Sequence, residues 1–351
     1  MKKNKKWLWV IIGLVLIFVT GNTSQAEESE SDIGYHIQAM IPKNQLDKEK
    51  SYFDLRMKPG EKQTIEFAIS NTSEEESEYE VAVNQAYTNA QGFIDYSEPK
   101  KSKLVKYAIE DIAEVEKSVK VAPRSVKKVP IKLTMPKESF DGQILSGIQV
   151  IKKGKKESSK ITNSYGYVLG LKLTETDKAV KRDIKLKKIE PAVSFGKTSV
   201  VVELENPTMD SIGHLKYDVK ITDEKTEETI KETTYGGDMQ MAPTSSYRLA
   251  IDWDNKSLKK GNYKLHLIVS DAKDNKWEFN EKFEITSEDA KKVNDLTVTE
   301  DNQKDFPYLW IIIGVIVLVL VIGIIIYVRK KKNSANNKKS KSKKKKKKSS
   351  K

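Results

Sequence analysis

Apolar and polar residues alternate along most of the chain between residues 64 and 285, with the period of two that is typical of β-strands. In the first such segment, Ile65, Phe67 and Ile69 alternate with polar neighbours. The same pattern returns at 129–135, 165–173, 200–204, 215–221, 263–269 and 277–285. Turn-forming Gly, Pro and Asn residues separate these segments. Short alternating strands with almost no helical period predict an all-β protein built from antiparallel sandwiches.

A polar run at residues 152–160 divides the strand-rich part of the chain. Because a run without apolar side chains is typical of a linker, it predicts two immunoglobulin-like antiparallel β-sandwich domains in series, at 34–155 and 160–287. An alternative stays open: the run is a hairpin loop, and the strand at 164–174 pairs back onto the first sheet. Residues 288–307 are expected to form a short helix, capped by Ser287, and a stalk.

A weak internal repeat favours two related modules. Residues 122–125 read Ala-Pro-Arg-Ser, residues 242–245 read Ala-Pro-Thr-Ser, and each tetrapeptide precedes a predicted strand. Each half also has an alternating strand that ends in asparagine, Asn71 in one and Asn206 in the other. The competing interpretation is that Ala-Pro-x-Ser is a common turn sequence, so that its repetition does not indicate related modules.

Two apolar segments flank this strand-rich part. The uncharged run at 308–328 has the length of a transmembrane helix, and the lysine-rich tail at 329–351 predicts that its carboxyl end is cytoplasmic. Residues 1–26 read as a signal peptide with lysines, a short apolar stretch and a small-residue cleavage site; an uncleaved anchor is the alternative. We therefore expect a single-pass plasma-membrane protein with extracellular domains, its tail lying on the anionic inner leaflet.

Charge and cysteine content narrow the possible functions. The net charge of +13 is concentrated in residues 1–26 and 329–351, and the part between them holds more acidic than basic side chains. This distribution gives no basic footprint for nucleic acid. The absence of cysteine excludes a disulfide framework, a thiol nucleophile and a zinc–thiolate site.

The sequence predicts no catalytic, cofactor-binding or metal-binding residues. The three histidines, His36, His214 and His266, stand apart from one another, and no established catalytic motif is present. Acidic residues are numerous, so a pair of carboxylates acting as in glycosidases stays open.

A turn at residues 87–96 is the best candidate for ligand binding. It places Tyr87, Phe93 and Tyr96 around a polar stretch that also contains Asp95. Aromatic side chains in such a turn stack on sugar rings or anchor a protein partner. The alternative is that Phe93 and Tyr96 close the end of the sandwich.

Several motifs in both halves resemble the WxL-interacting proteins of Gram-positive bacteria. In the first half the similar stretches are 41–45, 51–55, 58–60, 92–96 and 135–142. In the second half they are 206–207, 239–245, 260–263 and 277–279. The order of signal, span and lysine tail also matches that family, whereas the sequence after Asn294 follows its pattern only loosely.

The resemblance implies a function in surface binding. In that family the first module is assigned to peptidoglycan and the second to host proteins, and secreted proteins with a Trp-x-Leu (WxL) domain are partners. It implies no individual site residues. We therefore expect a non-enzymatic scaffold on the Gram-positive cell surface that binds peptidoglycan, WxL-domain proteins and host matrix proteins. Two alternatives are a membrane-anchored wall glycan hydrolase with paired carboxylates and a transmembrane sensor.

Overall fold

The computed structural model describes residues 34–100, 102–154 and 166–297, together with Leu318, Val321, Ile322 and Ile324. The expected signal peptide, most of the expected span and the lysine tail lie outside these residues. Within the described part, no helix is both long and apolar enough to cross a membrane. The expectations for the two ends of the chain therefore stay predictions.

The first sandwich consists of two sheets, with strand orders β1-β3-β9-β7 and β2-β11-β10-β4-β8. The first sheet contains β1 (Tyr35–Met40), β3 (Lys62–Asn71), β9 (Val126–Thr134) and β7 (Ala113–Val115). The second contains β2 (Phe53–Arg56), β11 (Gly166–Thr174), β10 (Gln143–Lys152), β4 (Ser77–Gln85) and β8 (Ser118–Val121). Neighbouring strands are antiparallel except for β2 and β11, which are parallel.

Strand β11 belongs to the first sandwich. It pairs along its whole length with β10, from Gln143 opposite Thr174 to Ile151 opposite Gly166, and its other edge pairs with β2. Its alternate residues, Leu169, Leu171 and Leu173, are buried in the first core. The polar run at 152–160 thus lies between two paired strands, as in the alternative left open above. The second sandwich was expected to start at residue 160, but the first strand after that residue, β11, pairs with strands of the first sandwich.

The second sandwich begins with β12 and has sheets of order β12-β13-β16 and β15-β14-β17-β18. The smaller sheet contains β12 (Lys185–Ser194), β13 (Lys197–Asn206) and β16 (Ser245–Asp252). The larger one contains β15 (Thr229–Met241), β14 (Ile212–Asp223), β17 (Gly261–Ser270) and β18 (Lys276–Ile285). Every pairing in both sheets is antiparallel.

Helix α3 (Ser287–Asp295) closes the second sandwich. Its N-cap is Thr286, whose hydroxyl accepts a hydrogen bond from the Asp289 amide, so the expectation that Ser287 caps the helix is wrong by one residue. Ala290 and Val293 are buried in the second core. The helix is therefore part of the folded module and does not begin a separate stalk.

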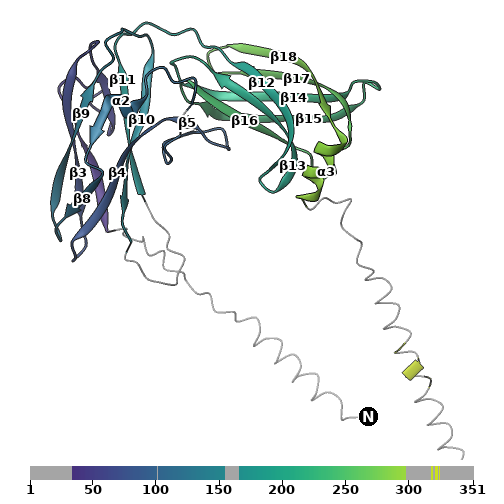
Figure 1. Cartoon of the computed structure of the whole chain (residues 1–351), viewed down its shortest axis with the longest axis horizontal. Helices are drawn as coiled ribbons and strands as arrows, with labels where there is room; N and C mark the ends of the chain where they lie inside the picture. The colour runs from purple at the N-terminus through teal and green to yellow at the C-terminus, as the bar shows by residue number, and fades with distance from the viewer. Residues whose placement is uncertain are drawn as a thin grey trace, which may run out of the picture.

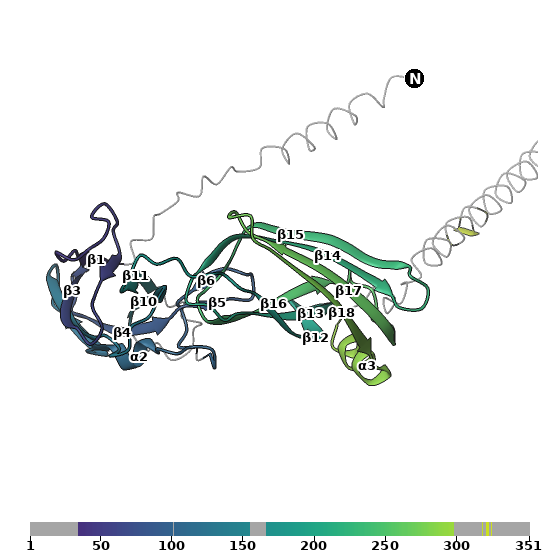
Figure 2. The same cartoon turned by 90° about the horizontal axis from the view of Figure 1, so that it is seen from above.

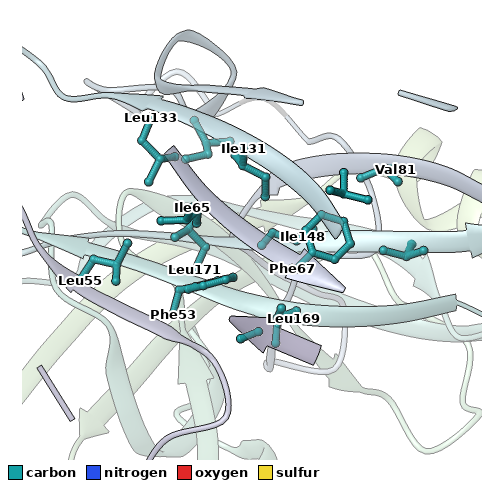
Figure 3. Close-up of a cluster of buried hydrophobic side chains, with 14 of the residues drawn as sticks. Phe53, Leu55, Ile65, Phe67, Val81, Ile131, Leu133, Ile148, Leu169 and Leu171 are labelled. Carbon is teal, nitrogen blue, oxygen red and sulfur yellow. The ribbon is translucent and has the colours of Figure 1, made fainter. Parts of the chain in front are cut away.

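Each sandwich has its own apolar core between its two sheets. Figure 3 shows Phe53, Leu55 and Leu171 of one sheet facing Ile65 and Phe67 of the other. All five side chains are almost completely buried. Because the chain has no cysteine, this burial and the sheet hydrogen bonds must stabilise each module.

A buried asparagine occupies the same place in both sandwiches. The side-chain amide of Asn71 donates to the carbonyl of Ala122 at 3.1 Å, and that of Asn206 donates to Ala242 at 2.9 Å. Both acceptors begin the repeated Ala-Pro tetrapeptides, and in each tetrapeptide the final serine hydroxyl donates back to the same alanine carbonyl at 2.8 Å. The third residue of both turns also has positive φ, 48° and 49°. The same arrangement of buried asparagine and Ala-Pro turn thus occurs in both sandwiches, in agreement with two related modules.

The two sandwiches lie side by side with their strands running in different directions (Figure 1). A small hairpin, β5 (Tyr87–Thr88) and β6 (Ile94–Asp95), leaves the first sandwich after β4 and extends toward the second. Figure 2 shows the same hairpin beside β16 from a perpendicular direction. The segment that follows contains the short helix α2 (Ile109–Ile112), which leads into β7.

We expect Asn71→Ala and Asn206→Ala each to destabilise their own sandwich by about 2–4 kcal/mol, since each removes a buried side-chain amide that donates to at least two backbone carbonyls. Urea unfolding of the detergent-solubilised chain measures this. Among the described residues both tryptophans, Trp253 and Trp277, pack on the second core, so tryptophan fluorescence should report chiefly the Asn206 variant. The exposed Asn262→Ala serves as control. Equal midpoints for all three variants would contradict the proposed role.

Candidate functional site

The aromatic turn at residues 87–96 forms a compact hairpin organised by Asn89. The side-chain oxygen of Asn89 accepts hydrogen bonds from the amides of Gln91 and Phe93, both at 3.0 Å. The backbone amide of Asn89 donates to the Phe93 carbonyl at 2.9 Å, and Gly92 takes up φ of 81° to close the turn. An Asn side chain that hydrogen-bonds its own turn backbone is a common way to fix such a loop.

The four candidate residues of this hairpin have different environments. Tyr87 is buried and its hydroxyl lies 3.1 Å from the Ser97 hydroxyl, whereas 44% of Phe93 is exposed. Asp95 accepts hydrogen bonds from the amides of Tyr96 and Ser97 at 2.6 and 2.8 Å. Tyr96 is half-buried, and burial raises the pKa of its hydroxyl to about 12. Phe93 is thus the one large apolar side chain of the four that solvent reaches freely.

Asp95 remains ionised in this setting. Burial opposes its charge, but hydrogen bonds from Ser97, Asn89 and Tyr96 outweigh that effect and hold the pKa of the carboxyl below its usual range. Its oxygens are directed at the hairpin's own backbone, so Asp95 orders the turn. Whether these four residues bind a ligand stays a prediction.

The hairpin also contacts the second sandwich, which the sequence did not predict. The hydroxyl of Thr88 lies 2.7 Å from that of Ser245 and accepts a hydrogen bond from the Ala242 amide at 3.1 Å. The amide of Gln240 donates to the carbonyl of Gly92 at 2.7 Å. The contact is therefore made with the Ala-Pro-Thr-Ser turn whose repetition was visible in the sequence.

A second contact joins the modules at the start of β10. The Gln143 amide donates to the Met209 carbonyl at 2.7 Å, and its side-chain amide donates to the Ser211 hydroxyl at 2.8 Å. Gly142 precedes it with φ of 96°, and a Cβ atom there would collide with the Met209 carbonyl. Only glycine allows this approach of backbone to backbone.

The connection between the modules is held by Arg182. Its guanidinium donates to Asp210 at 2.9 Å, to Asp271 at 2.7 Å and to the Ser211 carbonyl at 3.0 Å. The Asp271 side chain is fully buried; burial opposes its charge, but hydrogen bonds from Asn275 and Arg182 hold the pKa of its carboxyl below the usual range. This ion pair fixes the chain next to the Met209 contact.

An open groove of about 430 Å³ lies on the first sandwich, between α2, β7 and the ends of β3 and β9. Its lining offers hydroxyl, amide, carboxylate and ammonium groups, with Lys132 lying 3.5 Å from Glu114. The lining residues are Lys62, Gln63, Thr64, Glu110, Asp111, Ile112, Ala113, Glu114, Lys132, Leu133 and Thr134.

The groove has the chemistry of a polar polymer site. It contains donors and acceptors and charges of both signs, which suits the hydroxyl, amide and carboxyl groups of an amino-sugar chain with peptide stems. No aromatic side chain lies among its described lining residues, so a ligand would be held by hydrogen bonds and ion pairs. The sequence did not reveal this site because its members come from three separate segments, 62–64, 110–114 and 132–134.

The described residues offer no arrangement typical of catalysis. They contain no group of three or more potential metal ligands. His266 lies 3.0 Å from Glu278 and His214 lies 3.2 Å from Asp238, both on exposed surface. Every described carboxyl group with a shifted pKa has it lowered, for example Asp95, whereas a general acid needs a raised pKa.

Comparison with protein families gives two matches that together cover most of the chain. Residues 35–152 match the peptidoglycan-binding domain of WxL-interacting proteins. Residues 156–295 match the host-binding domain of the same proteins. None of the curated proteins compared with the chain matches it.

Solved structures with a similar arrangement include fimbrial chaperones. A chain of the chaperone–tip adhesin complex of CFA/I fimbriae biogenesis is 8% identical over 70% of this chain and 98% of its own, with a TM-score of 0.32. The E. coli chaperone DraB is 13% identical over 72% of this chain and 98% of its own, with a TM-score of 0.27.

We expect Gly142→Ala to loosen the contact between the sandwiches, because a methyl group collides with the Met209 carbonyl and positive φ is strained for alanine. Gly60→Ala is a matched control, since Gly60 has φ of 69° and open space around it. The control should cost about 1 kcal/mol. Gly142→Ala should cost about 1–3 kcal/mol more and speed proteolysis between residues 175 and 183. Identical cleavage rates would show that the contact does not hold the modules.

Proposed function

The chain belongs to the family of WxL-interacting proteins, and from this premise we propose that it is a non-enzymatic scaffold of the Gram-positive cell surface. Its two modules match the peptidoglycan-binding and host-binding domains of that family in the same order. This double match is the observation that carries the proposal.

Peptidoglycan binds in the groove of the first sandwich. The groove is open, lies within the matched peptidoglycan-binding domain and presents hydrogen-bonding groups of both kinds. An exposed strip of polar groups suits an extended polymer better than a small ligand, which would be enclosed on most sides. Lys132 and Asp111 are placed to meet carboxylates and amines of peptide stems.

Protein partners bind mainly through the second sandwich, and they include secreted proteins with a WxL domain and host matrix proteins. The span at 308–328 anchors the chain in the plasma membrane, with both sandwiches outside and the tail at 329–351 against anionic lipids. The interdomain contacts keep the glycan groove and the partner-binding module in a fixed relation. Such a protein links the wall to secreted partners near the membrane.

A sedimentation assay with purified cell-wall sacculi tests the glycan site. We expect Lys132→Ala to weaken binding of the full chain about fivefold, the effect of losing about 1 kcal/mol from one charge-assisted contact. Lys128→Ala is the matched control, since Lys128 is exposed on the same face of β9 but lies outside the groove. Equal binding of both variants would place the wall contact elsewhere, and release of soluble sugar fragments would favour a hydrolase.

A pull-down of secreted proteins from the same cells tests the partner claim independently. Recovery of a WxL-domain protein on the immobilised full chain is the expected result, and it should be unchanged in the Lys132 variant because the two ligands use different modules. Retention of sacculi without any WxL-domain protein would limit the function to wall binding.

A further inference from the structure

The turn between β12 and β13 exposes an aromatic side chain in a strained conformation. Ser194 pairs with Lys197, so the turn consists of the two residues Phe195 and Gly196. Both have positive φ, 50° and 75°. Of the Phe195 side chain, 63% is exposed.

Nothing in the fold accounts for phenylalanine at this position. A two-residue turn with positive φ at both positions favours Asn-Gly or Asp-Gly, because Asn and Asp tolerate this conformation and bulky residues do not. A buried aromatic would offset the strain by packing, but Phe195 lies mainly in solvent. An unfavourable backbone conformation retained without packing indicates a role outside the folded module.

Other exposed apolar side chains occur at the same end of the sandwich. Val193, opposite Thr198 in the hairpin, is 38% exposed, and Leu296 at the end of α3 is 68% exposed. The segment 256–258 connects the hairpin to α3 through hydrogen bonds. The Thr198 hydroxyl donates to the Lys256 carbonyl at 2.8 Å, and the Asn294 side chain of α3 bonds both the amide and the carbonyl of Leu258. Figure 1 shows α3 beside this end of β13.

Several lysines without an acidic partner lie around these apolar side chains. Three acids of this end pair with lysines, as Lys197–Asp252, Lys231–Asp254 and Lys291–Asp295, whereas the exposed Glu288 of α3 makes no ion pair within the described residues. Four further lysines are exposed and make no ion pair within the described residues: Lys256, Lys259, Lys260 and Lys292. Apolar side chains ringed by free lysines are typical of surfaces that rest on anionic lipid.

The direction of the chain places this end toward the apolar run. The described part of the second sandwich ends at Thr297, just after Leu296, and residues 298–307 separate it from the run at 308–328. Ten residues reach at most about 35 Å when fully extended. The end of α3 therefore lies within about 35 Å of any bilayer that the run crosses.

We propose that this end of the second sandwich docks on the outer lipid surface, with Phe195 inserted among the headgroups and the four lysines against anionic phosphates. The proposal rests on the membrane anchoring proposed above. Such docking fixes the orientation of the second sandwich to the bilayer, and the contacts at Gly92 and Gly142 carry that orientation to the glycan groove. The lipid surface is favoured over a protein partner because the chain itself holds this end beside it.

Depth-dependent quenching tests the proposal in the full chain. Because the protein has no cysteine, Phe195→Cys introduces a single thiol for an environment-sensitive fluorophore. In proteoliposomes of equal phosphatidylglycerol and phosphatidylcholine, we expect a lipid-borne nitroxide near the headgroup to quench this label at least twofold. The label on Val126→Cys, equally exposed but in the first sandwich, should show no quenching.

The outcomes separate docking from anchoring. Flotation of the chain with the vesicles measures anchoring alone; failure to float would overturn the anchoring. Flotation without quenching at residue 195 would overturn the docking. Quenching that is equal in pure phosphatidylcholine, or unchanged after Lys256→Glu, Lys259→Glu and Lys260→Glu together, would remove the role of anionic lipid. Crosslinking of residue 195 to a second protein in place of lipid would also overturn the proposal.

A second variant distinguishes loss of docking from loss of folding. Phe195→Asn relieves the strained turn, so its melting temperature should equal or exceed that of the parent chain. With a label on Leu296→Cys, the same variant should lose at least half of the lipid quenching. A lower melting temperature together with unchanged quenching would show that Phe195 serves the fold.

Discussion

The arrangement of the two sandwiches depends on close approach of their backbones at two glycines. Gly92 presents its carbonyl to the amide of Gln240, and Gly142 leaves room for Gln143 to reach the carbonyl of Met209, both bonds being 2.7 Å long. Both glycines have positive φ, and a side chain at either would meet atoms of the other module. Because two separate segments of the first sandwich make these contacts, a rotation of one module relative to the other would strain at least one of them.

This junction fixes the position of surfaces on the first sandwich relative to surfaces on the second. The groove proposed to bind glycan lies on the first sandwich beside α2, and the turn at Phe195 lies at the far end of the second. A flexible linker would let each surface act alone. Here, the ion pairs of Arg182 hold the intervening chain in place and the hairpin at Thr88 bonds the second sandwich directly, so contact at one surface would orient the other.

The alternation of apolar residues was sufficient to predict the all-β class and most strands, because the inward face of each strand must be apolar. The buried Asn71 and Asn206 could also be found from the repeat, since their partners lie in the matching Ala-Pro turns. The hairpin at 87–96 was ambiguous for a physical reason. An aromatic turn that binds a ligand and one that packs on a neighbouring module have the same composition, and the partner turn is more than 140 residues away. The groove could not be predicted, because no single segment contains its chemistry.

Strand β11 shows most clearly where sequence units and folded units differ. A polar run of lysines and serines fits a linker and a hairpin loop equally well, and the match to the host-binding domain begins at residue 156, before this strand. Yet β11 lies between β10 and β2, and its leucines fill the core of the first sandwich. Without it, β10 would have an unpaired edge and β2 would lose its only strand partner in the sheet. The first sandwich is therefore complete only after Thr174. The segment that matches the host-binding domain thus contributes its first strand, β11, to the first sandwich.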